Sequence, residues 1–176
     1  FQFDPRWSLS YSARIATDRT FMRRYDISTD DRLRSTFNLE RIGTSNYLSI
    51  SGWATQTLRR ADQQGQQPIA LPLIDFRQRI NDPLLGGQFE LQLNTLALTR
   101  TNGQDTQRAF AGARWDWRRL TPMGQEITLT GLVRGDVYHT DEGELTAIQD
   151  YAGKDGWQAR GIAAAAVDVR WAFIGE

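Results

Sequence analysis

The chain has 176 residues, a formal net charge of zero and a mean hydropathy of −0.53. The neutral balance excludes a strongly basic surface, so we expect no nucleic-acid partner, and no stretch approaches the run of about 18 apolar residues that a transmembrane helix needs. Low hydropathy does not exclude a membrane β-barrel, because only every second side chain of a barrel strand faces the lipid.

Five segments of the N-terminal half alternate polar and apolar residues with period two, which predicts strands. They are residues 7–15, 33–41, 47–58, 68–80 and 89–100. In the third segment, the pattern does not show which face is apolar. Pro72 in the fourth indicates a strand end or a bulge, because proline cannot donate to a strand ladder. The fifth changes parity midway, and a bulge near Thr95 would account for that change.

Alternation is clearest in three segments of the C-terminal half, residues 108–118, 127–138 and 157–173, where odd positions are mostly apolar or glycine. Phe110, Leu132 and Ile162 interrupt the opposite, polar face. Arginine and aspartate residues recur along the polar face of these three segments and form a charged row. The row consists of Arg108, Arg114, Asp116, Arg134, Asp136, Arg160, Asp168 and Arg170.

The links between the predicted strands alternate in length. The longer links are residues 18–31, 59–67 and 139–156, residues 101–106 are intermediate, and the short links are residues 42–46, 81–87 and 119–125. Long links therefore gather at one end of the strands and short ones at the other. Outer-membrane barrels have this asymmetry, with short periplasmic turns and long external loops. The fold class that follows is all-β, an antiparallel meander of about eight long strands.

A soluble β-sandwich also alternates polar and apolar residues, but three features favour a membrane barrel. Several strands are longer than the five or six residues usual in soluble sheets. The charged row suits a wet lumen. Tryptophans near strand ends are typical of the aromatic girdles at membrane interfaces. These lipid-interface aromatics are Trp7, Trp115, Trp117, Trp157 and Trp171.

The charged row has two interpretations. It can be a ladder of cross-strand ion pairs that keeps a water-filled wall in register. It can also contact an anionic amphiphile or a plug protein, because arginine, which supplies twenty of the 21 basic residues, suits bidentate recognition of phosphate.

His139 is the only histidine. A metal site with several histidines is therefore excluded within this chain, and no GxSxG element accompanies His139 as an acyl-transfer site would require. The acidic residues of the link after it lack EF-hand spacing. We predict no catalytic residue, no metal and no cofactor.

Five segments together resemble the LptD family, the lipopolysaccharide-assembly or organic solvent tolerance proteins, most closely its alphaproteobacterial members. They are residues 30–35, 71–75, 98–108, 134–138 and 166–171, in the same order and spacing. The resemblance covers nearly the whole chain.

The resemblance implies a large transmembrane barrel of about 26 strands in the outer membrane, which delivers lipopolysaccharide to the outer leaflet. It implies contacts with membrane lipid, with a lipoprotein plug, LptE, where one is present, and with periplasmic lipopolysaccharide bridge proteins through regions absent here. The family's periplasmic jelly roll, disulfide cysteines and gate between first and last strands have no counterpart in this segment.

We therefore expect residues 1–176 to be one segment of barrel wall, without enzymatic activity. The last predicted strand runs almost to Glu176, which favours excision from a longer protein. Two alternatives stay open. One is a complete eight-stranded outer-membrane barrel acting as an adhesin or anchor, and the other is an outer-membrane hydrolase in which His139 pairs with a nucleophile.

Overall fold

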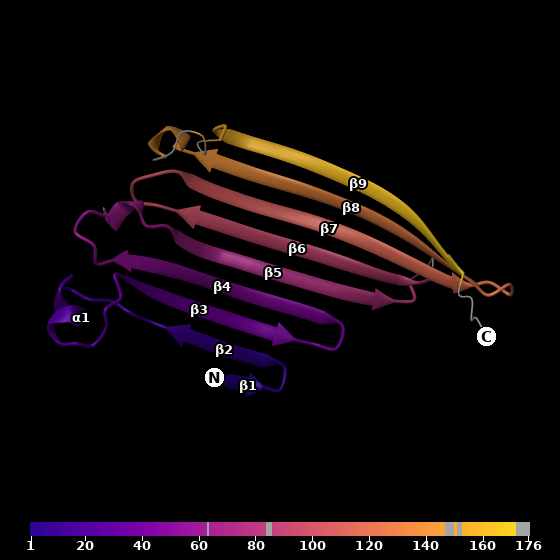
Figure 1. The fold of residues 1–176 in the computed structure, drawn as a ribbon, viewed down its shortest axis with the longest axis horizontal. Helices are drawn as coiled ribbons and strands as arrows, with labels where there is room; N and C mark the ends of the chain where they lie inside the picture. Colours follow the sequence, from indigo (N-terminus) through magenta and orange to yellow (C-terminus); the bar gives the residue numbers. More distant parts are fainter. Residues whose placement is uncertain (63, 84–85, 147–149, 151–152, 172–176) are drawn as a thin grey trace.

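The chain forms one antiparallel sheet in a computed structural model that describes residues 1–62, 64–83, 86–146, 150 and 153–171. Each strand pairs with its neighbours in sequence, in the order β1 to β9, so the sheet is an uninterrupted meander (Figure 1). The strands are β1 (Gln2–Asp4), β2 (Trp7–Ser12), β3 (Arg32–Ile42), β4 (Asn46–Thr57), β5 (Ile69–Asn81), β6 (Gln88–Thr99), β7 (Asp105–Leu120), β8 (Gln125–Asp141) and β9 (Gly156–Trp171). The all-β antiparallel meander predicted from alternation is confirmed.

The predicted strands correspond to β2–β9, and β1 is a short addition at one edge. β3 to β9 contain between 11 and 17 residues each, well beyond the usual length of a soluble strand. The predicted segment 7–15 is shorter in the structure, since β2 ends at Ser12. Single turns of helix lie in the described parts of the links, among them α1 (Phe21–Arg24), η1 (Gln64–Gln66) and η2 (Gly143–Leu145).

A bulge interrupts β5 at Leu71 and Pro72, where the pairing with both β4 and β6 shifts by one residue. Proline has no N–H to give to a ladder, so the irregularity falls at the residue that cannot pair. The predicted bulge near Thr95 is wrong, because β6 pairs with β7 in unbroken register from Gln88 to Leu98. The parity change in β6 instead places Leu96 and Leu98 on the polar face, where they pair with Arg108 and Thr106 of β7 and with Leu73 and Ala70 beside the bulge in β5.

Register carries the alternation across the whole sheet, because directly paired residues share a face. What we call the polar face holds the even-numbered residues of β2, β3 and β6–β9, the odd-numbered residues of β4, and those of β5 from Leu73 onward. The apolar face holds the opposite set. β4, ambiguous from sequence, places Leu48 and Ile50 on the apolar face through pairing with Phe76 and Ile74.

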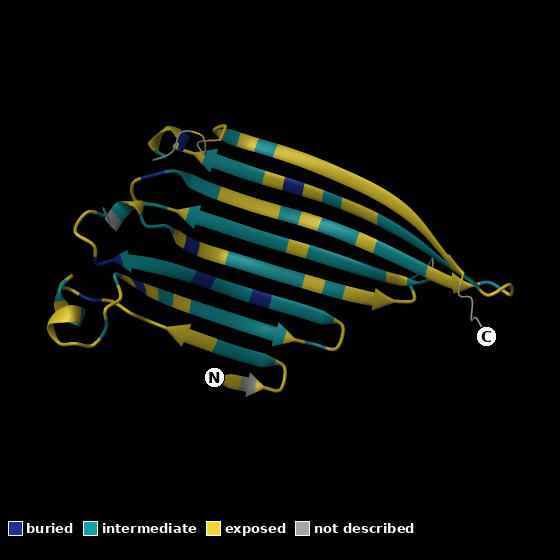
Figure 2. Ribbon diagram, in the orientation of Figure 1, coloured by how far each residue is buried: buried dark blue, intermediate teal, exposed yellow. Residues whose placement is uncertain are grey.

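Few side chains are fully buried, since most of the sheet is a single layer (Figure 2). A small core of Ala16, Leu33 and Leu58, joined by Met22, lies where the link 13–31 packs against the ends of β3 and β4. In the part of the chain that is described, no helix is long and apolar enough to cross a membrane.

Candidate functional site

All eight residues of the charged row lie on the polar face of β7, β8 and β9. Direct pairing joins Asp136 to Arg160 and Asp116 to Thr130. The even spacing along each strand determines the shared face, and the continuous register aligns the three strands. The sequence-predicted row is thus brought together on one surface.

Among the described residues of β7–β9, three ion pairs of this surface lie within a strand, between residues two apart, and three join neighbouring strands. Arg114 Nε donates to Asp116 at 2.6 Å, and Arg170 Nε donates to Asp168 at 2.8 Å. Thr130 adds a cross-strand hydrogen bond to Asp116 at 2.7 Å. For these two pairs the interpretation as a cross-strand ladder is wrong, because residues i and i+2 already share a face and can pair without a neighbouring strand.

Asp136 is different, since it accepts from arginines on three strands. Arg134, on its own strand, donates from Nη2 at 2.8 Å and from Nε at 3.1 Å. Arg108 of β7 donates at 3.3 Å and Arg160 of β9 at 3.4 Å. The Asp136 side chain is fully enclosed, whereas the three arginine side chains keep contact with solvent. We call Arg108, Arg134, Asp136 and Arg160 the Asp136 cluster.

Phe110 explains how a carboxylate becomes buried on an open sheet. It is the direct partner of Asp136 on β7, and its ring lies 4.1 Å from the Arg134 guanidinium and 5.7 Å from that of Arg108. The ring gives both cations a flat surface to stack on. Phe110, which interrupts the polar face in the sequence pattern, therefore packs against the Asp136 cluster, a role the sequence alone did not reveal.

The five predicted interface aromatics lie on the apolar face near strand ends. Trp157 begins β9 at the end with the long links, where its ring packs on His139 at 4.8 Å. The other four, Trp7, Trp115, Trp117 and Trp171, lie toward the end with the short turns. The Trp115 indole N–H donates to the Gly86 carbonyl at 2.9 Å, which anchors an apolar ring to a polar turn.

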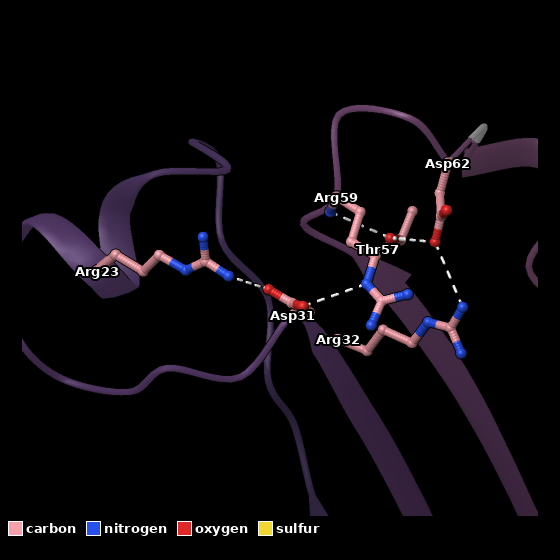
Figure 3. A network of polar contacts seen from close by, with 6 residues as sticks. All are labelled: Arg23, Asp31, Arg32, Thr57, Arg59 and Asp62. Carbon is pink, nitrogen blue, oxygen red and sulfur yellow. Dashed lines mark hydrogen bonds and ion pairs between the residues drawn. The ribbon is translucent and has the colours of Figure 1, made fainter.

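A second polar network ties the long links to the sheet (Figure 3). Asp31 accepts a hydrogen bond from Arg23 of α1 and another from Arg59 Nε, the latter at 3.2 Å. Asp62 accepts from the buried Thr57 hydroxyl at 3.0 Å and lies 3.4 Å from Arg32. Sequence reasoning missed this network, because its members come from two separate links and from the ends of β3 and β4.

The Thr57 hydroxyl, aided by Arg32, lowers the pKa of Asp62 below its ordinary value. The carboxylate is therefore held in its charged form at the start of the link 58–68.

His139 lies on the apolar face opposite Trp157. The described residues contain no group of three or more histidine, cysteine or acidic side chains placed to hold a metal. The contact that the described chain shows for the His139 ring is thus an aromatic one, with Trp157.

In a comparison with known protein families, the model of the LptD family, described as LPS transport system D, matches residues 1–176. A search of curated proteins finds no match.

Proposed function

The chain belongs to the LptD family, and on that premise we propose that residues 1–176 are a stretch of wall in a lipopolysaccharide-transport barrel of the outer membrane. The family match confirms the resemblance read from the sequence. The family acts in lipopolysaccharide transport and assembly and is not an enzyme family. In the proposed arrangement, the apolar face meets lipid and the polar face meets the lumen.

One observation carries this proposal: the polar and apolar faces stay separate from β6 to β9, which pair in unbroken register. β3 to β9, with 11 to 17 residues each, also reach or exceed the roughly nine to eleven that a tilted span requires. A soluble sheet buries its apolar face under a second layer. Here Val133, Val167 and Val169 stay more than half exposed on the apolar face of the described chain, as membrane lipid would require.

The aromatic residues support the same orientation. Trp7, Trp115, Trp117 and Trp171 would sit at the interface near the short turns, and Trp157 at the opposite interface. The long links would then face the cell exterior and the short turns the periplasm. Arg41 beside Trp7, at 5.9 Å, would lie at headgroup level, where a cation can reach phosphate.

The open edges of the sheet bear on the small-barrel alternative. In a complete eight-stranded barrel the first and last strands pair with each other. In the described chain β1 pairs only with β2 and β9 only with β8. Both edges are therefore available for further strands of a larger barrel, as a transport barrel of this family would supply.

The proposal also names the specific partners of the barrel wall. The polar face would contact lipopolysaccharide or a lipoprotein plug of the LptE type, and periplasmic bridge proteins would engage regions outside residues 1–176. An arginine-rich, hydrated surface supports passage of a phosphorylated saccharide, because guanidinium groups bind phosphate bidentately.

Photo-crosslinking in the full-length protein tests the proposal. A photoreactive residue at Thr128, on the polar face, should form adducts with lipopolysaccharide in growing cells. The same residue at the adjacent Leu129, on the apolar face, should capture membrane phospholipid instead. Equal lipopolysaccharide capture at both positions, or capture only at Leu129, would contradict the assignment of faces.

A further inference from the structure

The Asp136 cluster stands out on the polar face of β7–β9 because its charges do not balance. Arg114 pairs with Asp116, Arg118 with Glu126, and Arg170 with Asp168, one cation to one anion each. At Asp136 three guanidinium groups share a single carboxylate. Two positive charges in excess are therefore concentrated at one place on this part of the face.

The cluster also has hydrogen-bond donors to spare. A guanidinium carries five N–H groups, and within the described chain Arg108 and Arg160 each donate to Asp136 through one terminal nitrogen only. Their side chains are 42% and 54% exposed. The unused N–H groups of both arginines can therefore reach a ligand on the open side of the sheet.

The donors are held in place before any ligand arrives. Asp136 fixes one edge of each guanidinium, and the Phe110 ring stacks beneath Arg134 and Arg108. The strands that carry them are joined by regular pairing on both sides of Asp136. Donors that are already oriented lose less conformational freedom on binding, which favours affinity.

We propose that the Asp136 cluster is an anion site that takes a phosphate monoester of a saccharide lipid. A doubly charged phosphate matches the excess of two positive charges, and its tetrahedral oxygens suit forks that approach from two strands. A single carboxylate would neutralise only half of that excess. This inference rests on the proposed function, because only a lumen-facing cluster would meet such a substrate.

Asp136 would act here as a positioning residue. It gathers the three arginines and limits their excess charge, so that phosphate is held but can leave again, as transport requires. Without the carboxylate the arginines would repel one another and separate.

Binding to the purified full-length protein in detergent tests the site. The probes are lipid A with its phosphates, the same lipid A after enzymatic dephosphorylation, and phosphatidylglycerol. Arg160→Gln should weaken binding of phosphorylated lipid A about tenfold, the effect of losing one charged hydrogen-bond donor. Binding of the dephosphorylated form should be unchanged. Arg170→Gln is the matched control, since Arg170 lies on the same strand and face but is balanced by Asp168.

The outcomes of these measurements support or overturn the proposed phosphate site. Equal weakening by Arg160→Gln and Arg170→Gln would reduce the cluster to general surface charge and overturn the site. Equal weakening for phosphatidylglycerol would identify a phosphodiester headgroup as the ligand and overturn the assignment to a monoester. If Thr128 crosslinks lipopolysaccharide but Arg160→Gln has no effect on lipid A binding, the phosphate site is overturned while the proposed function stands. If Thr128 forms no crosslinks to lipopolysaccharide, the proposed function itself is overturned, and with it the premise of the site.

Discussion

The charge of Asp136 is stabilised by arginines on three strands, which only the folded sheet brings together. Its side chain is enclosed and accepts from three arginines, whereas the Asp168 side chain is 54% exposed and has one partner. A buried charge that loses its partners is costly, while an exposed pair contributes little.

The first prediction compares the two carboxylates in the full-length protein. Asp136→Asn should lower the midpoint of thermal unfolding by several degrees, because three guanidinium groups lose their shared anion. Asp168→Asn should lower it by no more than about one degree. Circular dichroism in detergent measures both, and equal shifts would refute the special role of Asp136.

Asp62 gives a prediction in pH at the same scale. Its pKa in the folded protein is lowered, chiefly by the Thr57 hydroxyl, so its contribution to stability is complete above the ordinary aspartate value of 3.8. That contribution disappears as the pH falls through the lower folded value. Hydrogen exchange in residues 58–62, corrected for intrinsic rates, should therefore accelerate below about pH 4. In Asp62→Asn the same exchange should already be fast at neutral pH and should not change further.

Gly87 and Gly124 show how a turn constrains single residues. Both have φ of +81°, a conformation that costs a residue with a Cβ about 1 kcal/mol. A Cβ at Gly87 would also meet the Asp116 carbonyl oxygen at 2.4 Å, whereas one at Gly124 would meet nothing within 4 Å.

Gly87→Ala should therefore destabilise the protein by about 2–4 kcal/mol, the sum of strain and overpacking. Gly124→Ala should cost only about 1 kcal/mol. Chemical unfolding of both variants checks the difference. A Gly124→Ala cost equal to that of Gly87→Ala would show that backbone conformation alone matters.

At the scale of the strand, β9 offers a test of the two faces with neighbouring alanines. Ala163 pairs with Val133 on the apolar face, and Ala164 pairs with Leu132 on the polar face. If the apolar face meets lipid, Ala163→Arg should cost about 2–4 kcal/mol near the bilayer midplane. Ala164→Arg should be far milder. Refolding titrations into lipid vesicles measure both, and equal costs would contradict the membrane assignment.

At the scale of the whole molecule, the links determine the topology. Lys154 is exposed in the long link after β8, and Met123 is 68% exposed in the short turn before it. With a single introduced cysteine in the full-length protein, Lys154→Cys should react with an impermeant maleimide on intact cells. Met123→Cys should react only after the outer membrane is permeabilised. The reverse pattern would invert the topology, and labelling of both on intact cells would argue against a membrane wall.

Period-two alternation was enough to predict the strands β2–β9, the faces of most of them and, through the lengths between them, the order of long and short links. These properties are local, because neighbouring side chains of any extended strand point to opposite sides. The face of Arg114 and Asp116, for instance, follows from their spacing alone. The same locality limited the prediction at residues 89–100, where a parity change could not be traced to its cause.

Only the tertiary structure decided which residues meet across strands. The bulge at Leu71 and Pro72 sets the register around β5, and the cluster at Asp136 needs β7, β8 and β9 aligned to the residue. A shift of one position would move Phe110 and Arg160 to the other face. Alternation cannot specify that alignment, because it repeats every two residues and fits many registers equally well. Turn geometry and backbone pairing select one register, and with it the partners of the buried carboxylate.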